Sequence, residues 1–223
     1  MNDQIESFFS SYLHQFFKKR ELVLRSDDIK KHIYYIKNGF LRAYRISEEG
    51  EELTLIILKQ GDFFPMTYGL NNLPSIYYLE ALTPLEVYKA PTEQFIEYIK
   101  GQPEIFFTLS TRVMDRYDGL LARMEYMIWS KAYTKVAATL LICARRFGED
   151  RGGKVIISVP LTHKDIATLI GITRETTSIE MKKLENKGII AKDGKHIIIN
   201  DFAKLKQESL LNNQEELLQN NFI

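Results

Sequence analysis

The stretch from Leu161 to Leu184, LTHKDIATLIGITRETTSIEMKKL, constrains the fold of this chain more than any other. It predicts two short helices joined by a tight turn at Gly171, because glycine readily adopts the left-handed backbone conformation that such a turn needs. Thr162, followed three residues later by Asp165, is close to a capping box and predicts the start of the first helix. Thr173 predicts the start of the second. Small or apolar side chains would let the two helices pack closely, and these are Ile166, Ala167, Ile170 and Ile172.

The second helix would carry Arg174 and Glu175 in its first turn. Arginine can donate two hydrogen bonds to guanine and glutamate can accept one from the cytosine amino group, so this placement is typical of a helix that enters the major groove of DNA. The alternative is an ordinary helical hairpin with a solvent-exposed Arg–Glu pair. Charge favours DNA, because residues 131–200 hold 13 Lys and Arg against 7 Asp and Glu in a chain of net charge +1.

Length and composition predict a globular protein with two regions. The 223 residues are enough for two cores, and a hydrophobic content of 45% is that of a soluble protein. No apolar run approaches the ~18–20 residues of a membrane span. The first residues, MNDQIESFF, lack the basic region of a secretory signal, so we expect a cytoplasmic protein without a membrane partner. The single cysteine, Cys143, excludes an internal disulfide within one chain.

The first half of the chain predicts a helix followed by many short strands. Residues 3–17 place apolar side chains at helical spacing, which predicts one amphipathic helix. Between Leu22 and Ala90, short β-type runs alternate with turn signals, which predicts a small antiparallel barrel or sandwich. The expected strands are His32–Ile36, Phe40–Ile46, Leu53–Leu58, Ile76–Leu82 and Leu85–Ala90.

A long helix is predicted next. Helical spacing resumes at Thr92, pauses near residues 101–103 and continues from Glu104 to about Trp129. A helix of that length spans ~37 Å at 1.5 Å per residue. Its apolar side chains recur at alternating steps of four and three, a pattern that favours a partner helix from a second copy of the chain over a buried core helix. The predicted dimer seam is Phe106, Val113, Tyr117, Leu120, Met124 and Met127.

The remaining elements complete a winged helix. After an expected hinge at residues 130–132, an amphipathic helix extends to Phe147, and a polar loop at 148–153 leads to a strand at Lys154–Val159. Strands at Ile189–Lys192 and His196–Ile199, joined at Asp193-Gly194, predict a β-hairpin behind the two-helix unit. The tail from residue 202 to residue 223 is predicted to be helical, with no assigned role.

With these elements in this order, the chain resembles the Crp/Fnr family of bacterial transcription regulators. The resemblance is carried by IYYIKNGFLRAY, EGEELTLIILKQGDFF, LEALTPLEVYKAPTEQF, LTHKDIATLIGITRET and KKLENKGII. It implies an α+β chain with an N-terminal antiparallel β-roll (jelly-roll) sensor domain at 1–103, a dimerisation helix at 104–130 and a winged helix-turn-helix at 131–223. It also implies a homodimer on palindromic double-stranded DNA, with half-sites ~34 Å apart. Contact with RNA polymerase is implied if the protein is an activator.

The resemblance also implies roles for individual residues. The base-reading positions would be Arg174, Glu175, Ser178 and Ile179, and the DNA-backbone positions would be Thr162, His163, Thr173, Thr176, Lys182 and Lys195. Many family members have an arginine where Ile179 stands, and Thr177 and Glu180 occupy positions that are usually apolar. We therefore expect either a slightly rotated recognition helix or an apolar contact from Ile179, such as one with a thymine methyl group.

A residue-by-residue comparison of the sensor with the family argues against cyclic AMP as the effector. Family members that bind cyclic nucleotides share a Gly-Glu-Leu, whose glutamate accepts from the ribose, and a later Arg-Ser or Arg-Thr, whose arginine neutralises the phosphate. Here Phe64-Pro65-Met66 and Ser75-Ile76 stand at those places, and no Lys or Arg lies between Lys59 and Lys89. A buried phosphate without a cationic partner is too costly to bind usefully.

The candidate effector pocket is therefore apolar and aromatic. It would bind an apolar or aromatic small molecule, or else be filled by its own side chains so that the protein has no effector. Its predicted lining is Phe63, Phe64, Met66, Tyr68, Tyr77, Leu120, Leu121 and Met124. The four histidines have no metal-ligand spacing and Cys143 lies alone in an apolar helix, so we expect no metal and no cofactor.

Two other classes of protein fit the sequence less well. An enzyme would need a nucleophile paired with histidine, a glycine-rich phosphate loop or a recognisable carboxylate pair, and none is present. A module that binds only other proteins would not need the basic segment or the placement of Arg174 and Glu175. The sequence favours a sequence-specific DNA-binding regulator over both.

Overall fold

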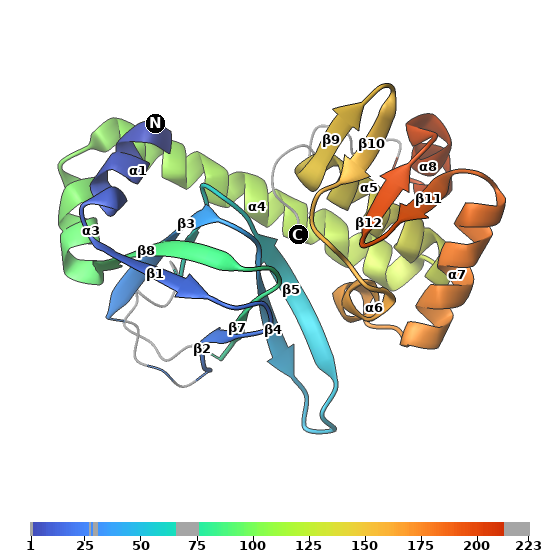
Figure 1. Cartoon of the computed structure of the whole chain (residues 1–223), viewed down its shortest axis with the longest axis horizontal. Helices are drawn as coiled ribbons and strands as arrows, with labels where there is room; N and C mark the ends of the chain where they lie inside the picture. Colours follow the sequence, from blue (N-terminus) through green and yellow to red (C-terminus); the bar gives the residue numbers. More distant parts are fainter. Residues whose placement is uncertain (1, 27, 29–30, 66–75, 212–223) are drawn as a thin grey trace. The chain divides into compact units, whose positions relative to one another are not determined.

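The computed structural model describes residues 2–26, 28, 31–65 and 76–211. Contacts between residues divide the chain into two compact units, Met1–Thr111 and Arg112–Ile223. The division falls inside the longest helix, α4 (Pro103–Trp129), so the first third of this helix, up to Thr111, belongs to the first unit and the rest to the second (Figure 1). Both units combine helices with antiparallel sheet, as the sequence predicts.

Two four-stranded antiparallel sheets form the β-roll of the first unit, in the orders β1-β8-β3-β6 and β2-β7-β4-β5. The strands are β1 (Leu13–Phe17), β2 (Leu22–Leu24), β3 (His32–Asn38), β4 (Leu41–Ile46), β5 (Glu52–Leu58), β6 (Phe63–Phe64), β7 (Tyr78–Ala81) and β8 (Leu85–Pro91). Strand β3 lies inside its sheet and residues 33–36 are buried on both faces. That position explains why this strand is continuously apolar instead of alternating.

The two sheets enclose one core, and helices cover the outer face of the first sheet. Leu41 and Leu79 from one sheet pack with Tyr34 and Val87 from the other. On the opposite face of β3, a second cluster joins that strand to α1 (Asn2–Ser10), α3 (Thr92–Lys100) and the first turns of α4 (Figure 1). The β-roll is therefore a three-layer structure in which each apolar face has a cover.

The helix predicted over residues 3–17 is wrong beyond Ser10. Residues Leu13–Phe17 form β1 and pair along their whole length with β8, from Leu13↔Lys89 to Phe17↔Leu85. The spacing of the aromatic residues fitted both a helix and an edge strand. Pairing with a distant strand decided between them, and it leaves Leu13 60% and Phe16 67% exposed on the edge.

The second unit holds a helix-turn-helix between two hairpins of one antiparallel sheet, with the order β11-β12-β10-β9. Residues Gly148–Arg151, predicted to be a loop, instead form β9, which pairs with β10. Residues 212–223 of the predicted helical tail lie outside the described residues. The elements are α5 (Ala132–Phe147), β9 (Gly148–Arg151), β10 (Lys154–Ile157), α6 (His163–Ile170), α7 (Arg174–Asn186), β11 (Ile190–Asp193), β12 (His196–Ile199) and α8 (Phe202–Ser209).

Two searches of the described part of the chain bear on function. No helix within residues 2–26, 28, 31–65 and 76–211 has both the length and the apolar character that a membrane crossing requires. Nor do these residues bring three or more His, Cys, Asp or Glu side chains together in a way that could hold a metal ion.

Candidate nucleic-acid interface

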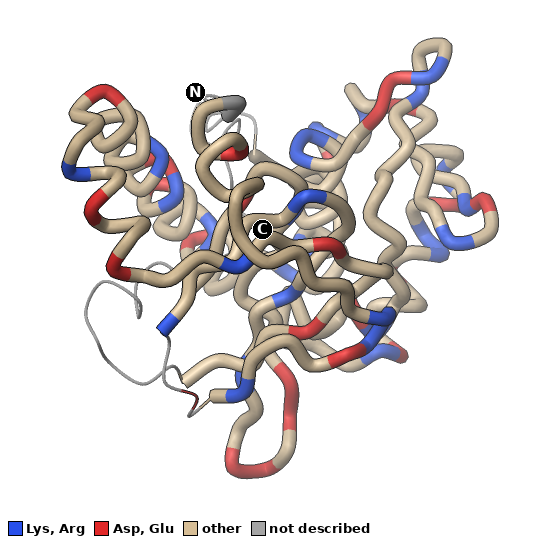
Figure 2. The backbone as a smooth tube through the Cα atoms, turned by 60° about the vertical axis from the view of Figure 1, so that its left-hand side comes forward, with Lys and Arg blue, Asp and Glu red and all other residues tan. Residues whose placement is uncertain are grey.

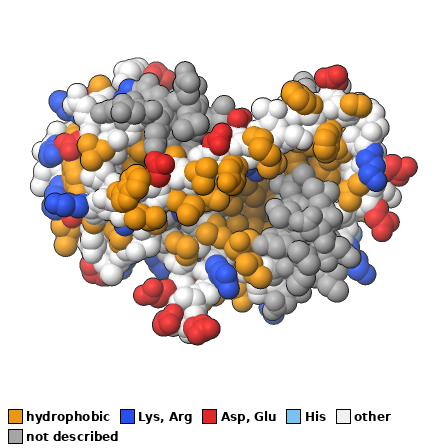
Figure 3. Space-filling model, turned by 180° about the vertical axis from the view of Figure 1, so that it is seen from behind, with side chains coloured by type: hydrophobic (Ala, Val, Ile, Leu, Met, Phe, Trp, Pro, Cys, Tyr) orange, Lys and Arg blue, Asp and Glu red, His pale blue; other side chains and the backbone are white. Residues whose placement is uncertain are grey.

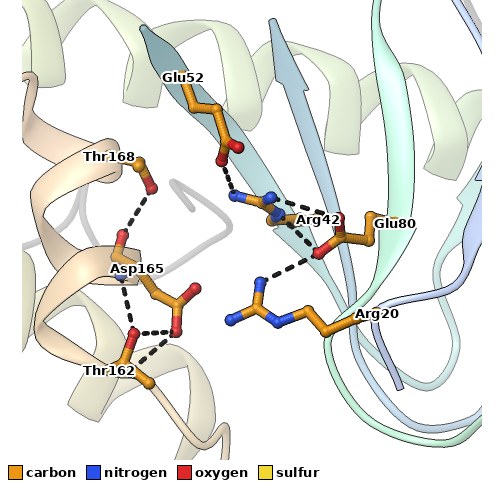
Figure 4. A network of polar contacts seen from close by, with 7 residues as sticks. All are labelled: Arg20, Arg42, Glu52, Glu80, Thr162, Asp165 and Thr168. Carbon is orange, nitrogen blue, oxygen red and sulfur yellow. Dashed lines mark hydrogen bonds and ion pairs between the residues drawn. The ribbon is translucent and has the colours of Figure 1, made fainter. Parts of the chain in front are cut away.

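Helix α6 begins at a capping box. The hydroxyl of Thr162 accepts a hydrogen bond from the backbone N of Asp165 at 3.1 Å and donates to its carboxylate at 2.7 Å. The carboxylate also accepts from the backbone N of Thr162 at 2.9 Å (Figure 4). These bonds satisfy amides that have no partner inside the helix and so determine where α6 begins. The predicted cap is confirmed.

The turn after α6 and the start of α7 are also determined by hydrogen bonds between residues close in sequence. Gly171 adopts φ 64° and ψ 42°, the left-handed conformation that the sequence predicted, and its N–H donates to the carbonyl of Ala167. Thr173 then caps α7, because its hydroxyl accepts from the backbone N of Thr176 at 3.1 Å. Arg174 is therefore the first residue of the second helix, where a base-reading side chain needs to be.

The four predicted base-reading residues share one outward face of α7. Arg174 and Glu175 are exposed, Ser178 is half-buried and Ile179 is 58% exposed. Their spacing of i, i+1, i+4 and i+5 places them on one side of a helix. An exposed isoleucine between polar neighbours makes this face suited to read an apolar group as well as polar base edges.

The opposite face of α7 is packed although it carries polar residues. Thr177 is fully buried, and its hydroxyl donates to the carbonyl of Thr173 at 3.0 Å. Glu180 is also buried, and Lys183 Nζ lies 2.9 Å from Oε1 and 2.7 Å from Oε2 of its carboxylate. The helix has not rotated to bring these residues to the surface. Ile179 faces outward, and the apolar base contact expected from it stays a prediction.

Several of the predicted DNA-backbone residues already have partners within the chain. The hydroxyls of Thr173 and Thr176 lie 2.9 Å apart, and the Thr162 hydroxyl belongs to the capping box. Lys182 Nζ is 3.0 Å from Glu185 Oε2, in a pair whose lysine is well exposed. Lys195 is exposed in the two-residue loop between β11 and β12. Both lysines can reach an anion at little cost, since exposed ion pairs are weak.

His163, at the first position of α6, is a half-buried imidazole that feels the positive charges of nearby side chains. Its Nε2 is buried and has no hydrogen-bond partner among the described residues. Burial holds the pKa of His163 below its ordinary value, and the positive charges of Lys192 and Arg174 act in the same direction against a smaller opposing effect of Glu185. Its role as a DNA-backbone residue stays a prediction, because the buried Nε2 must become accessible before it can donate to a phosphate oxygen.

Charge differs between the two units. In the first unit, the turn between β4 and β5 is acidic, with Glu48, Glu49, Glu51 and Glu52 close together (the lowest loop in Figure 2). The second unit contains the segment of residues 131–200, where Lys and Arg outnumber Asp and Glu by 13 to 7. The excess of positive charge is thus in the unit that carries α6 and α7, as contact with phosphates requires.

The predicted dimer seam lies on the exposed side of α4. Hydrophobic side chains gather along this side, and five of the six seam residues are between 51% and 61% exposed, whereas Met127 is half-buried (Figure 3). The other side of the helix is buried through Ile105, Leu109, Ala122 and Tyr126. Among the described residues, a long apolar stripe of α4 therefore stays exposed, and exposed apolar patches are typical of interaction surfaces. The stripe extends beyond the predicted seam to Phe107, Met114, Leu121, Ile128 and Trp129.

Two of the predicted effector-pocket residues, Phe63 and Phe64, belong to different hydrophobic clusters of the first unit. Phe64 faces the core between the sheets and stacks on Tyr34, with ring centroids 5.2 Å apart. Phe63 points to the other face and packs edge-on against Phe95 at 5.5 Å, so the prediction that Phe63 and Phe64 line one pocket is wrong. Consecutive residues of a strand face opposite sides, which explains the error. Tyr77 is half-buried, Leu120, Leu121 and Met124 are exposed on α4, and Met66 and Tyr68 lie outside the described residues.

Two family profiles match the chain. The profile described as a cyclic nucleotide-binding domain matches residues 14–102, and the profile described as a Crp-like helix-turn-helix domain matches residues 134–208. The first region corresponds to the strands of the β-roll and α3, and the second runs from α5 to α8. Each half of the chain thus has its own known counterpart, in the order found here.

Individual proteins match over nearly the full length. The Global nitrogen regulator of Nostoc sp. is 27% identical over 198 residues, which cover 86% of this chain and 87% of that protein. The cAMP-activated global transcriptional regulator CRP of Pasteurella multocida is 25% identical over 198 residues, which cover 87% of this chain and 93% of that protein. Both relatives are regulators by name.

Solved structures show the same fold. A CooA variant from Carboxydothermus hydrogenoformans superposes with a TM-score of 0.75 at 20% identity, covering 91% of this chain and 90% of that one. FixK2 from Bradyrhizobium japonicum also gives a TM-score of 0.75, at 21% identity, and covers 87% of this chain and 96% of that one. The arrangement of β-roll, long helix and winged helix is therefore shared despite low sequence identity.

Proposed function

The chain belongs to the Crp/Fnr family of transcription regulators, and from that membership we propose that it acts as a homodimer that binds a palindromic DNA site through α7. Members of this family are regulators with a DNA-binding helix-turn-helix and are not enzymes. The observation that carries the proposal is the outward face of α7, where Arg174, Glu175 and Ile179 are exposed on a helix that caps hold at a defined starting residue.

In the proposed complex, the first turn of α7 reads bases. Arg174 donates to the O6 and N7 acceptors of guanine, and Glu175 accepts from the amino group of the cytosine beside it. One turn later, Ile179 contacts a thymine methyl group and Ser178 makes an adjustable polar contact. His163 and the exposed Lys182 and Lys195 contact phosphates, together with Thr162, Thr173 and Thr176, and set the register of the helix in the groove.

The exposed stripe of α4 supports the homodimer. A stripe that carries Tyr117, Leu120 and Met124 at heptad spacing is self-complementary, and a two-fold axis through it presents two copies of α7 to the DNA. Two recognition helices related in this way read a palindrome whose half-sites lie about one helical turn apart. If the dimer activates transcription, RNA polymerase is its further partner.

We propose that cyclic AMP is not the effector. Binding of cAMP is stated in the name of the Pasteurella relative and belongs to that protein. In this chain no Lys or Arg lies between Lys59 and Lys89, and Phe64, which replaces the glycine of the binding cassette, fills the interior against Tyr34. An apolar small molecule, or no effector at all, fits this sensor better than a cyclic phosphate.

Selection of DNA by the purified protein tests the proposal. The full chain is incubated with a random-sequence library at fixed salt, with and without cyclic AMP, and the bound DNA is sequenced. We expect enrichment of a two-fold symmetric motif with a G·C pair in each half-site, unchanged by cyclic AMP. Failure to enrich a symmetric motif under either condition would favour a winged helix that binds protein instead of DNA. A motif that depends on cyclic AMP would refute the interpretation of the sensor.

A further inference from the structure

The buried side of α4 holds an arginine that contacts the helix-turn-helix. Arg123 is only 6% exposed, and its Nη2 donates a hydrogen bond to the backbone carbonyl of Leu169 in α6. Both residues belong to the second compact unit. Sequence reasoning missed this residue, since no motif or spacing distinguishes an arginine that turns inward from one that faces solvent.

The accepting carbonyl lies where a helix needs an external donor. Leu169 is the last residue but one of α6, so its carbonyl is among the four that have no partner inside a helix. The N–H groups of Gly171 and Ile172 both donate to Ala167 instead. A guanidinium here satisfies a buried acceptor and places positive charge at the negative end of the helix dipole. Arg123 therefore stabilises the residues just before the turn between α6 and α7.

A second residue of α4 lies near the turn itself. Met127, one helical turn after Arg123, has its Cε 4.0 Å from the position that a Cβ on Gly171 would occupy. Gly171 is the residue whose left-handed conformation sends the chain into α7. Arg123 thus bonds to the end of α6, and Met127, which also belongs to the predicted dimer seam, lies near the turn. We call these two residues the α4 latch.

The residues next to the α4 latch in sequence face the other way. Leu120 and Met124 are each 51% exposed and lie on the apolar stripe of α4. Arg123 and Met124 are consecutive residues, so a single turn of one helix carries a stripe residue on its exposed side and a latch residue on its buried side. A shift or rotation of α4 that changes packing at the stripe moves the latch by the same amount, because a helix turn is stiff.

We propose that Arg123 is a positioning residue that couples packing of the apolar stripe of α4 to the placement of α7. This inference rests on the proposed function, since it assumes that the stripe joins two copies and that α7 binds DNA. The second half of α4 belongs to the same compact unit as the helix-turn-helix, so the chain segment at 130–132 is not the only connection between them. The direction of α7 then depends on α4 itself, through the latch.

The proposal is tested with Arg123→Met, which keeps an unbranched apolar stem similar to that of arginine and removes the charge and the donors. Arg123→Lys is the conservative variant, and Arg151→Met is the matched control because Arg151 is a 68% exposed arginine on β9 of the same unit. For each full-length variant, Kd for the selected DNA, the dimer fraction and the thermal midpoint are measured. Amide hydrogen exchange of Gly171 and Ile172 reports whether the turn is held.

A second local measurement uses the only cysteine. Cys143 is fully buried in α5, where burial raises the pKa of its thiol to about 12 against the opposing charges of Arg146 and Arg123. A thiol this inaccessible reacts with a disulfide reagent only when the packing around it opens. Loss of the latch should therefore speed both the reaction of Cys143 and exchange at the turn, whether or not DNA is present.

We expect Arg123→Met to remain a dimer and to bind the selected DNA about tenfold more weakly, with faster amide exchange at Gly171 and Ile172. Arg123→Lys should recover part of the lost affinity. Arg151→Met should leave amide exchange at the turn unchanged. Unchanged affinity and exchange in Arg123→Met would overturn the proposal. If that variant does not fold, the milder Arg123→Gln, which also removes the charge, replaces it, and wild-type affinity and exchange at the turn in Arg123→Gln would overturn the proposal. If the wild-type protein binds no DNA, the proposed function fails, and exchange and Cys143 reactivity still test the latch.

Discussion

The winged helix and the β-roll differ in how far apart in the sequence the residues that determine their structure lie. In the winged helix, the starts of α6 and α7 each depend on a cap between residues three apart, Thr162 with Asp165 and Thr173 with Thr176. In the β-roll, β1 takes its conformation from β8, and Leu13 pairs with Lys89. The first kind of constraint can be read from a short stretch of sequence, whereas the second depends on pairing between distant segments.

This difference explains why the DNA-reading face of α7 could be predicted from the sequence, whereas the effector pocket of the β-roll could not. Once its caps fix the start of α7, helical geometry alone places Arg174 and Glu175 on its outer face. The interior of the β-roll depends instead on which faces of two sheets meet, and a shift of one residue exchanges inside for outside. Phe63 and Phe64, adjacent in sequence, consequently lie in different clusters.

The largest expected effect tests the long-range constraint in the β-roll. Arg42 on β4 is buried, and its guanidinium lies 2.9 Å (Nη1) from Oε2 of Glu52 and 3.2 Å (Nε) from Oε1 of Glu80 (Figure 4). The same Oε1 of Glu80 lies 3.0 Å from Nη1 of Arg20. These residues come from separate strands and from the segment before β2. We expect Arg42→Met to lower the free energy of unfolding of the first unit by about 3 kcal/mol, because Glu80 and Glu52 lose a buried cationic partner. Urea unfolding followed by circular dichroism measures it.

A neighbouring arginine provides the control for this prediction. Arg45 lies on the same strand but is exposed, so Arg45→Met should change the unfolding free energy by less than about 0.5 kcal/mol. Equal midpoints for the two variants would show that the buried network adds nothing to the β-roll. In that case, long-range pairing of the strands would rest on backbone hydrogen bonds and apolar packing alone.

The parts of the fold that follow from the sequence are those with short-range causes. Both caps, the turn at Gly171 and the extent of α4 follow from residue type and spacing. Residues 11–17 and 148–151 were predicted incorrectly, because an edge strand takes its structure from its neighbour and can carry almost any exposed side chain. Arg123 escaped prediction for a related reason, since only its surroundings show that it points inward.

The next largest effect concerns the short-range site. We expect Arg174→Ala to weaken binding to the selected DNA by about 1–3 kcal/mol and to relax the preference at one base pair of each half-site, with no change in stability because the residue is exposed. Fluorescence anisotropy with the selected and single-substituted duplexes measures both effects. Lys182→Ala is the comparison, and it should weaken all sequences alike and reduce the salt dependence. Equal losses for selected and random DNA in Arg174→Ala would show that it contacts phosphate.

The smallest expected effect concerns Ile179, which is 58% exposed on the outer face of α7. The experiment distinguishes an isoleucine that contacts a base from one that is exposed but contacts no DNA. Replacing one thymine by deoxyuridine removes only the methyl group, so loss of the proposed contact should cost about 0.8 kcal/mol, roughly fourfold in Kd, per half-site. The substitution is made at each thymine of the selected site in turn, with the wild-type protein and with Ile179→Ala. We expect one position to be sensitive in the wild type and insensitive in the variant, because the methyl group then has no side chain to contact. If each replacement changes Kd equally for the wild type and for Ile179→Ala, Ile179 reads no base.

The base-reading residues of α7 would then be Arg174, Glu175 and Ser178, and the exposed Ile179 would have a role other than DNA recognition.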